Sequence, residues 1–150
     1  MRNNQLIELE TDRDVLKSEV LKNCKENTWA RLRESSIHGV GVFAVRDIPS
    51  GTSIFPETIT EFMFIEWDEV ADFHPSLIKM IKDFYVTNEK GFWSPPHSLN
   101  KIDPSYFLNH NKKNNCIHLE NGDIRSCKLI LIGTELTLNY ESIYESKLAE

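Results

Sequence analysis

The spacing of hydrophobic and polar positions changes along this chain, and the changes predict its elements. From Trp29 onward, short runs either alternate, as in Ala30-Arg31-Leu32-Arg33, or are rich in β-branched residues, as in residues 39–45. Such runs are typical of short strands. Residues 47–51 contain Pro49 and Gly51 and predict a turn, after which Ser53-Ile54-Phe55 predicts the start of another strand.

Between about residues 66 and 85 the apolar positions follow a helical period instead. Pro75 suits the first turn of a helix, where its missing N–H would have no partner in any case. Residues 88–106 contain Gly91 and three prolines, and predict a loop with a short strand at residues 91–93. The predicted helix has one apolar stripe with three- and four-residue spacing, formed by Leu77, Ile78, Ile81, Phe84 and Tyr85.

The first 27 residues form a charged segment that we expect to be a helical extension, with residues 28–150 as the main domain. Thr11 followed by Asp14 resembles a capping box, which predicts that a helix starts there. Leu16 and Val20 would lie on one face of that helix.

A hairpin is predicted near the C-terminus, because Asn121-Gly122 separates two strand-like runs at residues 116–119 and 124–130. Many short strands with one or two helices indicate a β-rich α+β fold. A chain of 150 residues is most simply organised around one main domain.

Composition and charge narrow the possible partners. The net charge is −6, and the basic residues are scattered, which argues against nucleic acid as a partner and favours a basic protein. No apolar run approaches the roughly 20 residues that span a bilayer, and we expect no membrane association. Cys24, Cys116 and Cys127 are far apart, with no CxxC pair, so we expect neither disulfides nor a metal site. These features are typical of an intracellular, reduced protein, cytoplasmic or nuclear in a host cell.

Three short phrases carry candidate chemistry. The first is His38-Gly39-Val40-Gly41, whose glycines let backbone groups approach a ligand closely, although paired glycines are more often a simple turn. The second is Asn109-His110 within residues 106–116. The third, Ile132-Gly133-Thr134-Glu135-Leu136-Thr137-Leu138-Asn139-Tyr140, ends a predicted strand on a phenol.

Together and in this order, the three phrases resemble those of SET domains, over roughly residues 31–144. In that family the second phrase reads N-H-S-C-x-P-N and the third I-x-x-G-E-E-L-T-x-D-Y. By its size the chain is similar to the short bacterial and viral SET proteins. The resemblance implies a SET fold: several small curved sheets, a short helical insert and a C-terminal pseudoknot.

The resemblance also implies an activity, the transfer of a methyl group from S-adenosylmethionine (SAM) to a lysine of a protein substrate. It implies catalytic roles for Tyr140 and for Tyr85, which would line the lysine channel, although Tyr85 is equally well explained as a core residue. The expected cofactor-binding residues are His38, Gly39, Val40, Gly41, Asn109, His110 and Tyr144.

The chain departs from the family phrases at several positions. Asn111, Lys112 and Asn114 replace the Ser, Cys and Pro, and Asn139 replaces the Asp before the final Tyr. The zinc site that many relatives build after this domain is therefore not expected. Tyr144 or Ile143 in the tail could close the substrate channel instead, although a frayed tail is as good an interpretation.

Two other functions remain open. The altered stretch of residues 111–114 also suits a catalytically inactive SET fold that binds peptides. The N-terminal helix could drive self-association, so a homodimer is possible on the sequence alone.

Overall fold

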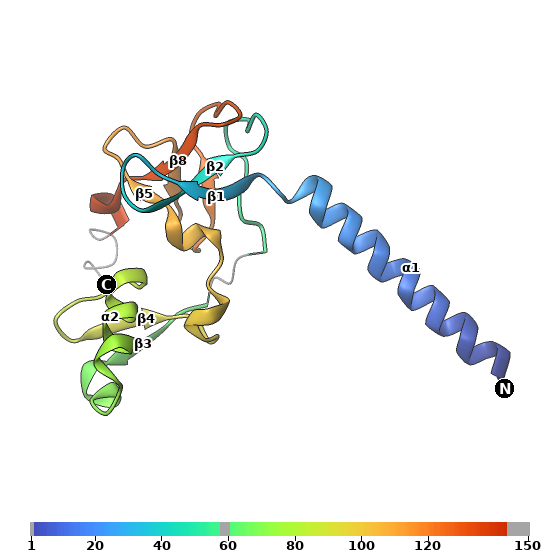
Figure 1. Ribbon diagram of the computed structural model, residues 1–150, viewed down its shortest axis with the longest axis horizontal. Coiled ribbons are helices and arrows are strands. Elements are labelled where there is room, and N and C mark those ends of the chain that lie inside the picture. The colour runs from blue at the N-terminus through green and yellow to red at the C-terminus, as the bar shows by residue number, and fades with distance from the viewer. Residues whose placement is uncertain (1, 58–60, 144–150) are drawn as a thin grey trace.

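The computed structural model describes residues 2–57 and 61–143 of the 150-residue chain. Its strands are short and its longest element is the N-terminal helix (Figure 1). In chain order the elements are α1 (Arg2–Glu26), β1 (Ala30–Glu34), β2 (Val40–Ala44), β3 (Met63–Glu66), η1 (Trp67–Val70), α2 (Pro75–Phe84), β4 (Gly91–Ser94), η2 (Leu99–Lys101), η3 (Pro104–Phe107), β5 (Asn109–His110), β6 (Cys116–His118), β7 (Ile124–Ser126) and β8 (Glu135–Leu138).

A four-stranded sheet of order β1-β2-β8-β5 forms the centre of what we call the main lobe. The β1–β2 and β2–β8 pairs are antiparallel, whereas β5 and β8 run parallel, with Asn109 opposite Thr137. The last strand therefore lies between two earlier ones, an insertion that the expected pseudoknot requires. The sheet predictions for residues 30–33 and 39–45 are confirmed, but Leu32 is exposed, so the alternation in β1 marks no buried face.

The predicted hairpin is confirmed as β6 and β7, which pair from Cys116–Ser126 to His118–Ile124. Gly122 adopts φ 86°, a left-handed conformation that suits glycine in the turn. The second strand is shorter than predicted and ends at Ser126. Beyond it, Ile130 pairs with Ile48 instead, through two backbone hydrogen bonds of 2.7 and 2.9 Å.

The strand predicted at residues 53–55 is absent, and the structure has only a single bridge there, between Ser53 and Arg125. The Ser126 side chain explains why. Its hydroxyl donates to the Pro49 carbonyl (2.6 Å) and accepts from the Thr52 N–H (3.0 Å). These bonds hold the turn of residues 49–52 across the end of β7, which leaves little length for a ladder.

Residues 61–101 form a second body, the insert lobe, which contains β3, η1, α2, β4 and η2 and lies below the main lobe in Figure 1. As predicted, α2 begins at Pro75, and the His74 side chain caps it by accepting from the Ser76 N–H at 3.2 Å. The predicted apolar stripe packs toward β4 except at Leu77, which is exposed at the rim. Strand β3 was not predicted, because its pairing with β4 joins residues about 30 positions apart.

Each lobe has its own hydrophobic core. The main-lobe core is centred on residues of β2, β8 and the hairpin, including the fully buried Val42, Leu136 and Cys116. The insert-lobe core contains Val70, Ile81, Tyr85 and Phe92. Since the two clusters are separate, the surface between the lobes is free to form a site rather than a packed interior.

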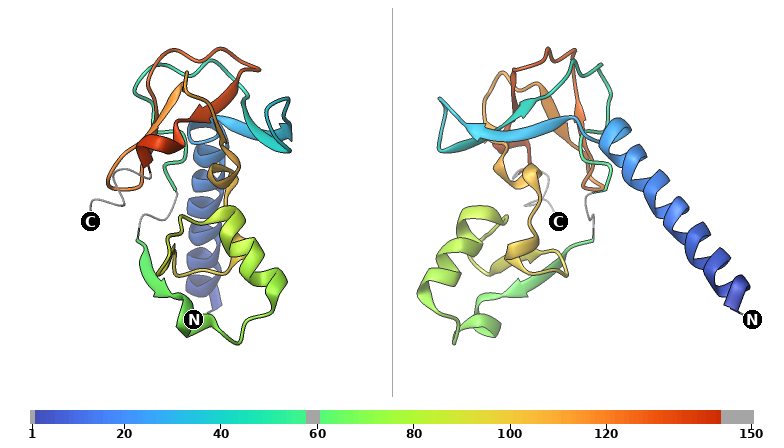
Figure 2. Two further views of the ribbon diagram at one scale, coloured as in Figure 1. Left: turned by 90° about the vertical axis from the view of Figure 1, so that its left-hand side faces the viewer. Right: turned by 45° about the vertical axis from the view of Figure 1, so that its right-hand side comes forward.

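Helix α1 projects away from both lobes (Figure 2). It begins at Arg2, so the prediction of a helix start at Thr11 is wrong: no break in the charged sequence stops the helix from continuing toward the N-terminus. Its C-terminal end is held by Arg46, which donates to the carbonyls of Lys25 (2.7 Å) and Glu26 (3.1 Å) and stacks on the Trp29 ring at 3.7 Å. Among the described residues, no helix is both long and apolar enough to cross a membrane.

The main-lobe core predicts a clear difference between two leucines. Leu136→Ala removes a fully buried side chain from β8, and we expect the free energy of unfolding to fall by about 2–5 kcal/mol. Leu131→Ala is the matched control, since that side chain is 57% exposed, and its effect should stay within about 0.5 kcal/mol. Urea unfolding measures both, and equal losses would show that the core is misassigned.

Candidate active site

One buried side chain, Asn109 at the start of β5, joins three segments that are far apart in the sequence. Its amide nitrogen lies 3.0 and 3.3 Å from the carbonyl oxygens of His38 and Val40, and 2.9 Å from Glu135 Oε1. It also lies 3.1 Å from Ser35 Oγ. All four neighbours can accept a hydrogen bond, which fixes the orientation of the amide, with its oxygen turned away from them.

The second glycine of the first phrase makes room for this arrangement. A Cβ on Gly41 would lie 2.2 Å from Glu135 Oε1, so only glycine lets that carboxylate approach the strand. Ser35 Oγ donates to the same carboxylate, at 2.8 and 3.0 Å from its two oxygens. We call Ser35, Gly41, Asn109 and Glu135 the Asn109 cluster. The group that comes close to the Gly41 backbone is therefore a carboxylate of the protein itself.

His110 follows Asn109 on β5, which is an edge strand of the sheet. The Asn111 N–H donates to the Leu138 carbonyl at 2.9 Å, and backbone direction alternates along a strand. The N–H and C=O of His110 therefore point away from β8, toward the open edge. Its ring nitrogen Nδ1 accepts a 3.0 Å hydrogen bond from the Tyr140 N–H, which places the imidazole proton of the neutral ring on Nε2.

Tyr140 follows β8 by two residues, and its hydroxyl donates to the Leu108 carbonyl, directly before Asn109. Its ring lies 5.4 Å from the His110 ring. The structure thus brings the Asn-His step, the first glycine phrase and Tyr140 together, as the sequence predicts.

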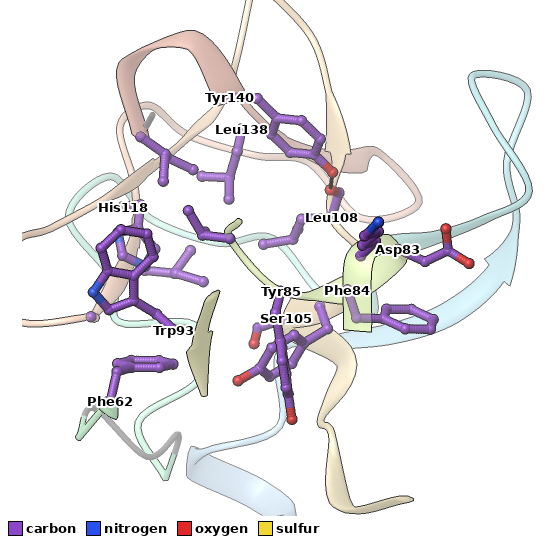
Figure 3. A pocket seen from close by; sticks show the side chains of 16 residues that line it. Phe62, Asp83, Phe84, Tyr85, Trp93, Ser105, Leu108, His118, Leu138 and Tyr140 are labelled. Atoms are coloured by element: carbon purple, nitrogen blue, oxygen red, sulfur yellow. Dashed lines mark hydrogen bonds between the residues drawn. The ribbon is translucent and has the colours of Figure 1, made fainter. Parts of the chain in front are cut away.

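Tyr140 lines a cavity of about 180 Å³ between the main lobe and the insert lobe (Figure 3). The main lobe contributes residues of η3, β6, β7 and β8 and the residue just before β5, and the insert lobe contributes the end of α2 together with β4. Asn109, His110 and the first glycine phrase are not among the lining residues. Aromatic side chains share the insert-lobe wall with the charged side chains of Lys82 and Asp83. They include Phe62, Phe84, Tyr85 and Trp93, opposite Leu108, Leu138, Tyr140 and Ile143.

Tyr85 lies on this wall and is also part of the insert-lobe core. It is 7% exposed and stacks on Phe92, with ring centroids 6.2 Å apart. Burial raises the pKa of its phenol, and the neighbouring Ser94 hydroxyl opposes that rise in part. Among the described residues, the Tyr85 hydroxyl is buried and has no hydrogen-bond partner. Tyr85 therefore presents its ring, more than its hydroxyl, to the cavity.

A sequence model of the SET domain matches residues 39–141, more than two thirds of the chain. The chain belongs to the SET domain family. This family consists generally of protein-lysine methyltransferases, and the small sheets with a short helical insert are the SET fold.

Among solved structures, a candidate histone methyltransferase from Plasmodium falciparum is similar to this SET domain. The two are 18% identical, the match covers 75% of this chain and 93% of the other, and the TM-score is 0.48. No curated protein matches the chain.

The departures from the SET phrases lie around the site without entering it. Asn139 Oδ1 accepts from the Glu141 N–H at 3.1 Å, a role that the family's aspartate could equally fill. Lys112 is exposed and pairs with Glu141 at 3.4 Å. Asn115, the final Asn of the second phrase, holds β8 by donating to the Glu135 carbonyl and accepting from the Thr137 N–H, both at 2.8 Å.

Several residues of this SET domain were not predicted as part of the site. Tyr106 lines the cavity and lies 5.8 Å from Tyr85, ring to ring. Burial, aided by Tyr85 and Asp103, raises the pKa of Tyr106 to about 12. Tyr106 and Glu135 both stand within the matched phrases, so their position was a usable signal. Trp93 and Ser35 carried none, because only the folded lobes bring them to the site.

Two further expectations concern Tyr144 and a metal site. Tyr144 lies outside the described residues, although its neighbour Ile143 lines the cavity. Within residues 2–57 and 61–143, no group of three or more His, Cys, Asp or Glu side chains is placed to hold a metal ion.

The close contact at Gly41 predicts strong coupling with Glu135. Gly41→Ala should lower the free energy of unfolding by about 2–3 kcal/mol, because the new methyl group displaces the carboxylate and its hydrogen bonds. In a Glu135→Ala background the same change should cost less than about 1 kcal/mol. Gly39→Ala is the control: with φ 48° and no atom near its Cβ, its strain should be the same in both backgrounds. Additive losses in a urea double-mutant cycle would contradict the contact.

The raised pKa of Tyr106 predicts a loss of stability in alkali. The unfolded phenol ionises near pH 10 and the folded one near 12, so its contribution is complete below pH 10 and is lost as the pH rises to 12. The free energy of unfolding of the wild type should fall more steeply between pH 10 and 12 than that of Tyr106→Phe. Parallel curves for the two proteins would show that the phenol is not buried.

Proposed function

We propose that this protein transfers a methyl group from SAM to a lysine side chain of a protein substrate. The observation that supports the proposal most directly is the cavity between the lobes. Tyr140 lines it from the main lobe, next to the Asn109 cluster, and an aromatic wall faces Tyr140 from the insert lobe.

The residues around Asn109 would hold the head group and base of SAM. Within the described chain, the Asn109 amide oxygen accepts no hydrogen bond and is free to receive an ammonium group. The outward N–H and C=O of His110 offer one donor and one acceptor, which suits the edge of an adenine ring. The exposed His38–Val40 loop borders the same region. When bound, SAM would supply a sulfonium methyl that a nucleophilic amine can attack.

The enzyme must present a neutral lysine, and the cavity wall favours that form. Taking the proton from a lysine of pKa about 10.4 at pH 7 costs roughly 4–5 kcal/mol. The aromatic and aliphatic parts of the wall disfavour the ammonium, which lowers this cost, whereas Lys82 adds a like charge and the Asp83 carboxylate an opposite one. Burial also raises the pKa of Tyr85 and of Tyr106, so neither phenol supplies an anion that would stabilise the ammonium at neutral pH.

Tyr140 would orient the reacting amine. Its hydroxyl donates to the Leu108 carbonyl, which fixes the position of the phenol on the cavity wall. The partner residues that hold Tyr140 on both sides, Leu108 and His110, flank Asn109. The amine and the cofactor would thus be aligned by one continuous piece of backbone, and alignment is the main source of rate for a direct transfer.

The charge distribution supports a basic substrate. The chain carries a net charge of −6, and residues 57–72 contain six acidic side chains with no lysine or arginine. Much of this segment lies in the insert lobe, which forms one wall of the cavity. An acidic surface there would attract a lysine-rich protein segment and raise its local concentration.

The proposal predicts that Tyr140→Phe separates catalysis from cofactor binding. We expect methyl transfer from radioactive SAM to a basic protein probe, core histones, to fall by at least about 100-fold. Affinity for S-adenosylhomocysteine, measured by calorimetry, should stay within a few-fold, and the melting temperature should serve as the folding control.

Two outcomes would contradict this function. Failure of the wild type to bind S-adenosylhomocysteine at millimolar concentration would remove the cofactor site altogether. Binding of a lysine peptide without any transfer, unchanged by Tyr140→Phe, would favour the inactive, peptide-binding alternative.

A further inference from the structure

Helix α1 presents apolar side chains to solvent that nothing in the described chain covers. Val15, Leu16, Val20 and Leu21 are 56, 60, 52 and 60% exposed. No described helix or strand packs along α1, which projects away from both lobes in Figure 1 and in the right-hand view of Figure 2. A helix in water gains most of its stability from packing an apolar face, so a solitary helix about 37 Å long lacks the packing partner that would stabilise it.

The anchoring of α1 shows that its direction is set by the fold. Arg46 holds the last two carbonyls of the helix, and its guanidinium stacks on Trp29 at the start of β1. The Asn27 side chain donates to that of Asn23 at 2.7 Å, which adds a further bond across the last turn. These bonds therefore set the orientation of the helix, and its apolar residues lie away from the main lobe.

Two of the four exposed apolar residues follow the spacing of a two-stranded coiled coil. With Leu16 at position d of a heptad, Val20 falls at the next position a, and the sequence continues the same spacing toward the N-terminus at Leu9 and Leu6. A β-branched residue at a with leucine at d favours two parallel strands. Val15 and Leu21 fall at positions c and b, outside this seam.

The charges that flank the seam suit the same arrangement. In a parallel pair, the residue at g faces the residue at e five positions further along the other helix. Asp12 at g would face Lys17 of the second copy at e, and the two-fold axis would form this pair twice. Arg13 at a and Asn23 at d are polar breaks in the seam, which lower its stability and fix its register.

We propose that α1 of two copies of this chain pair as a parallel coiled coil through Leu16 and Val20. The protein is then a dimer whose two main lobes lie side by side at the C-terminal ends of the paired helices. This inference is independent of the methyl-transfer proposal, because it uses no residue of the cavity or of the Asn109 cluster.

Matched double variants of the full-length chain test the seam. Leu16→Glu/Val20→Glu should convert a dimer to a monomer in sedimentation equilibrium at about 50 μM, with a loss of helical circular dichroism. Val15→Glu/Leu21→Glu changes the same residue types at nearly the same exposure, and should remain dimeric. A monomeric wild type at this concentration, or equal effects of the two variants, would overturn the proposal.

The orientation of the helices is tested with a spin label on Cys24, which is exposed near the end of α1. Cys127→Ser removes the other exposed thiol, while Cys116 is buried and should not react. Parallel helices about 10 Å apart should place the two labels within roughly 25 Å of each other. A fully overlapping antiparallel pair would separate residue 24 from its counterpart by about 30 Å along the axis. A distance in that longer range would overturn the parallel arrangement.

Discussion

The Asn109 amide is the interaction on which the rest of the site depends. It joins the His38–Val40 loop, the Ser35 turn and the β8 residue Glu135, which are separated by up to 100 residues in the chain. Hydrogen bonds to a charged group contribute about 1.5–3 kcal/mol each, and a buried donor without a partner costs a similar amount. The absence of a side chain at Gly41 permits this geometry. The first SET phrase is therefore fixed against the other two by polar bonds, before any ligand is considered.

The division into two lobes explains why a cavity lies between them. Each lobe buries its own apolar cluster, so the wall between them keeps a cavity instead of closing into a single core. The lobes remain in contact through Phe84 of the insert lobe and Phe107 of the main lobe, whose ring centroids are 5.3 Å apart. Tyr85 belongs to both features, because the same ring lines the cavity and packs in the core of the insert lobe. Changes at Tyr85 will thus alter stability and channel shape together.

Local sequence signals predicted the elements whose formation depends on neighbouring residues. Asn121-Gly122 placed the β6–β7 hairpin and Pro75 placed the start of α2, since turn and first-turn preferences act over a few residues. Strand β3 and the role of Ser35 were missed because they depend on partners far away in the chain. The predicted helix start at Thr11 was wrong for a different reason. A capping pattern is only a local preference, and the helix continued through it.

The altered family phrases do not argue against activity once their positions in space are known. Asn139 uses its side-chain oxygen as an acceptor, which an aspartate would do as well, so this exchange removes no bond. Lys112 stands in solvent beside Glu141 and touches neither the cavity wall nor the Asn109 cluster. The groups on which the transfer would depend are instead those around Asn109 and Tyr140, and their mutual bonds are intact. An inactive fold would need a defect in those groups, and neither Lys112 nor Asn139 takes part in their bonds.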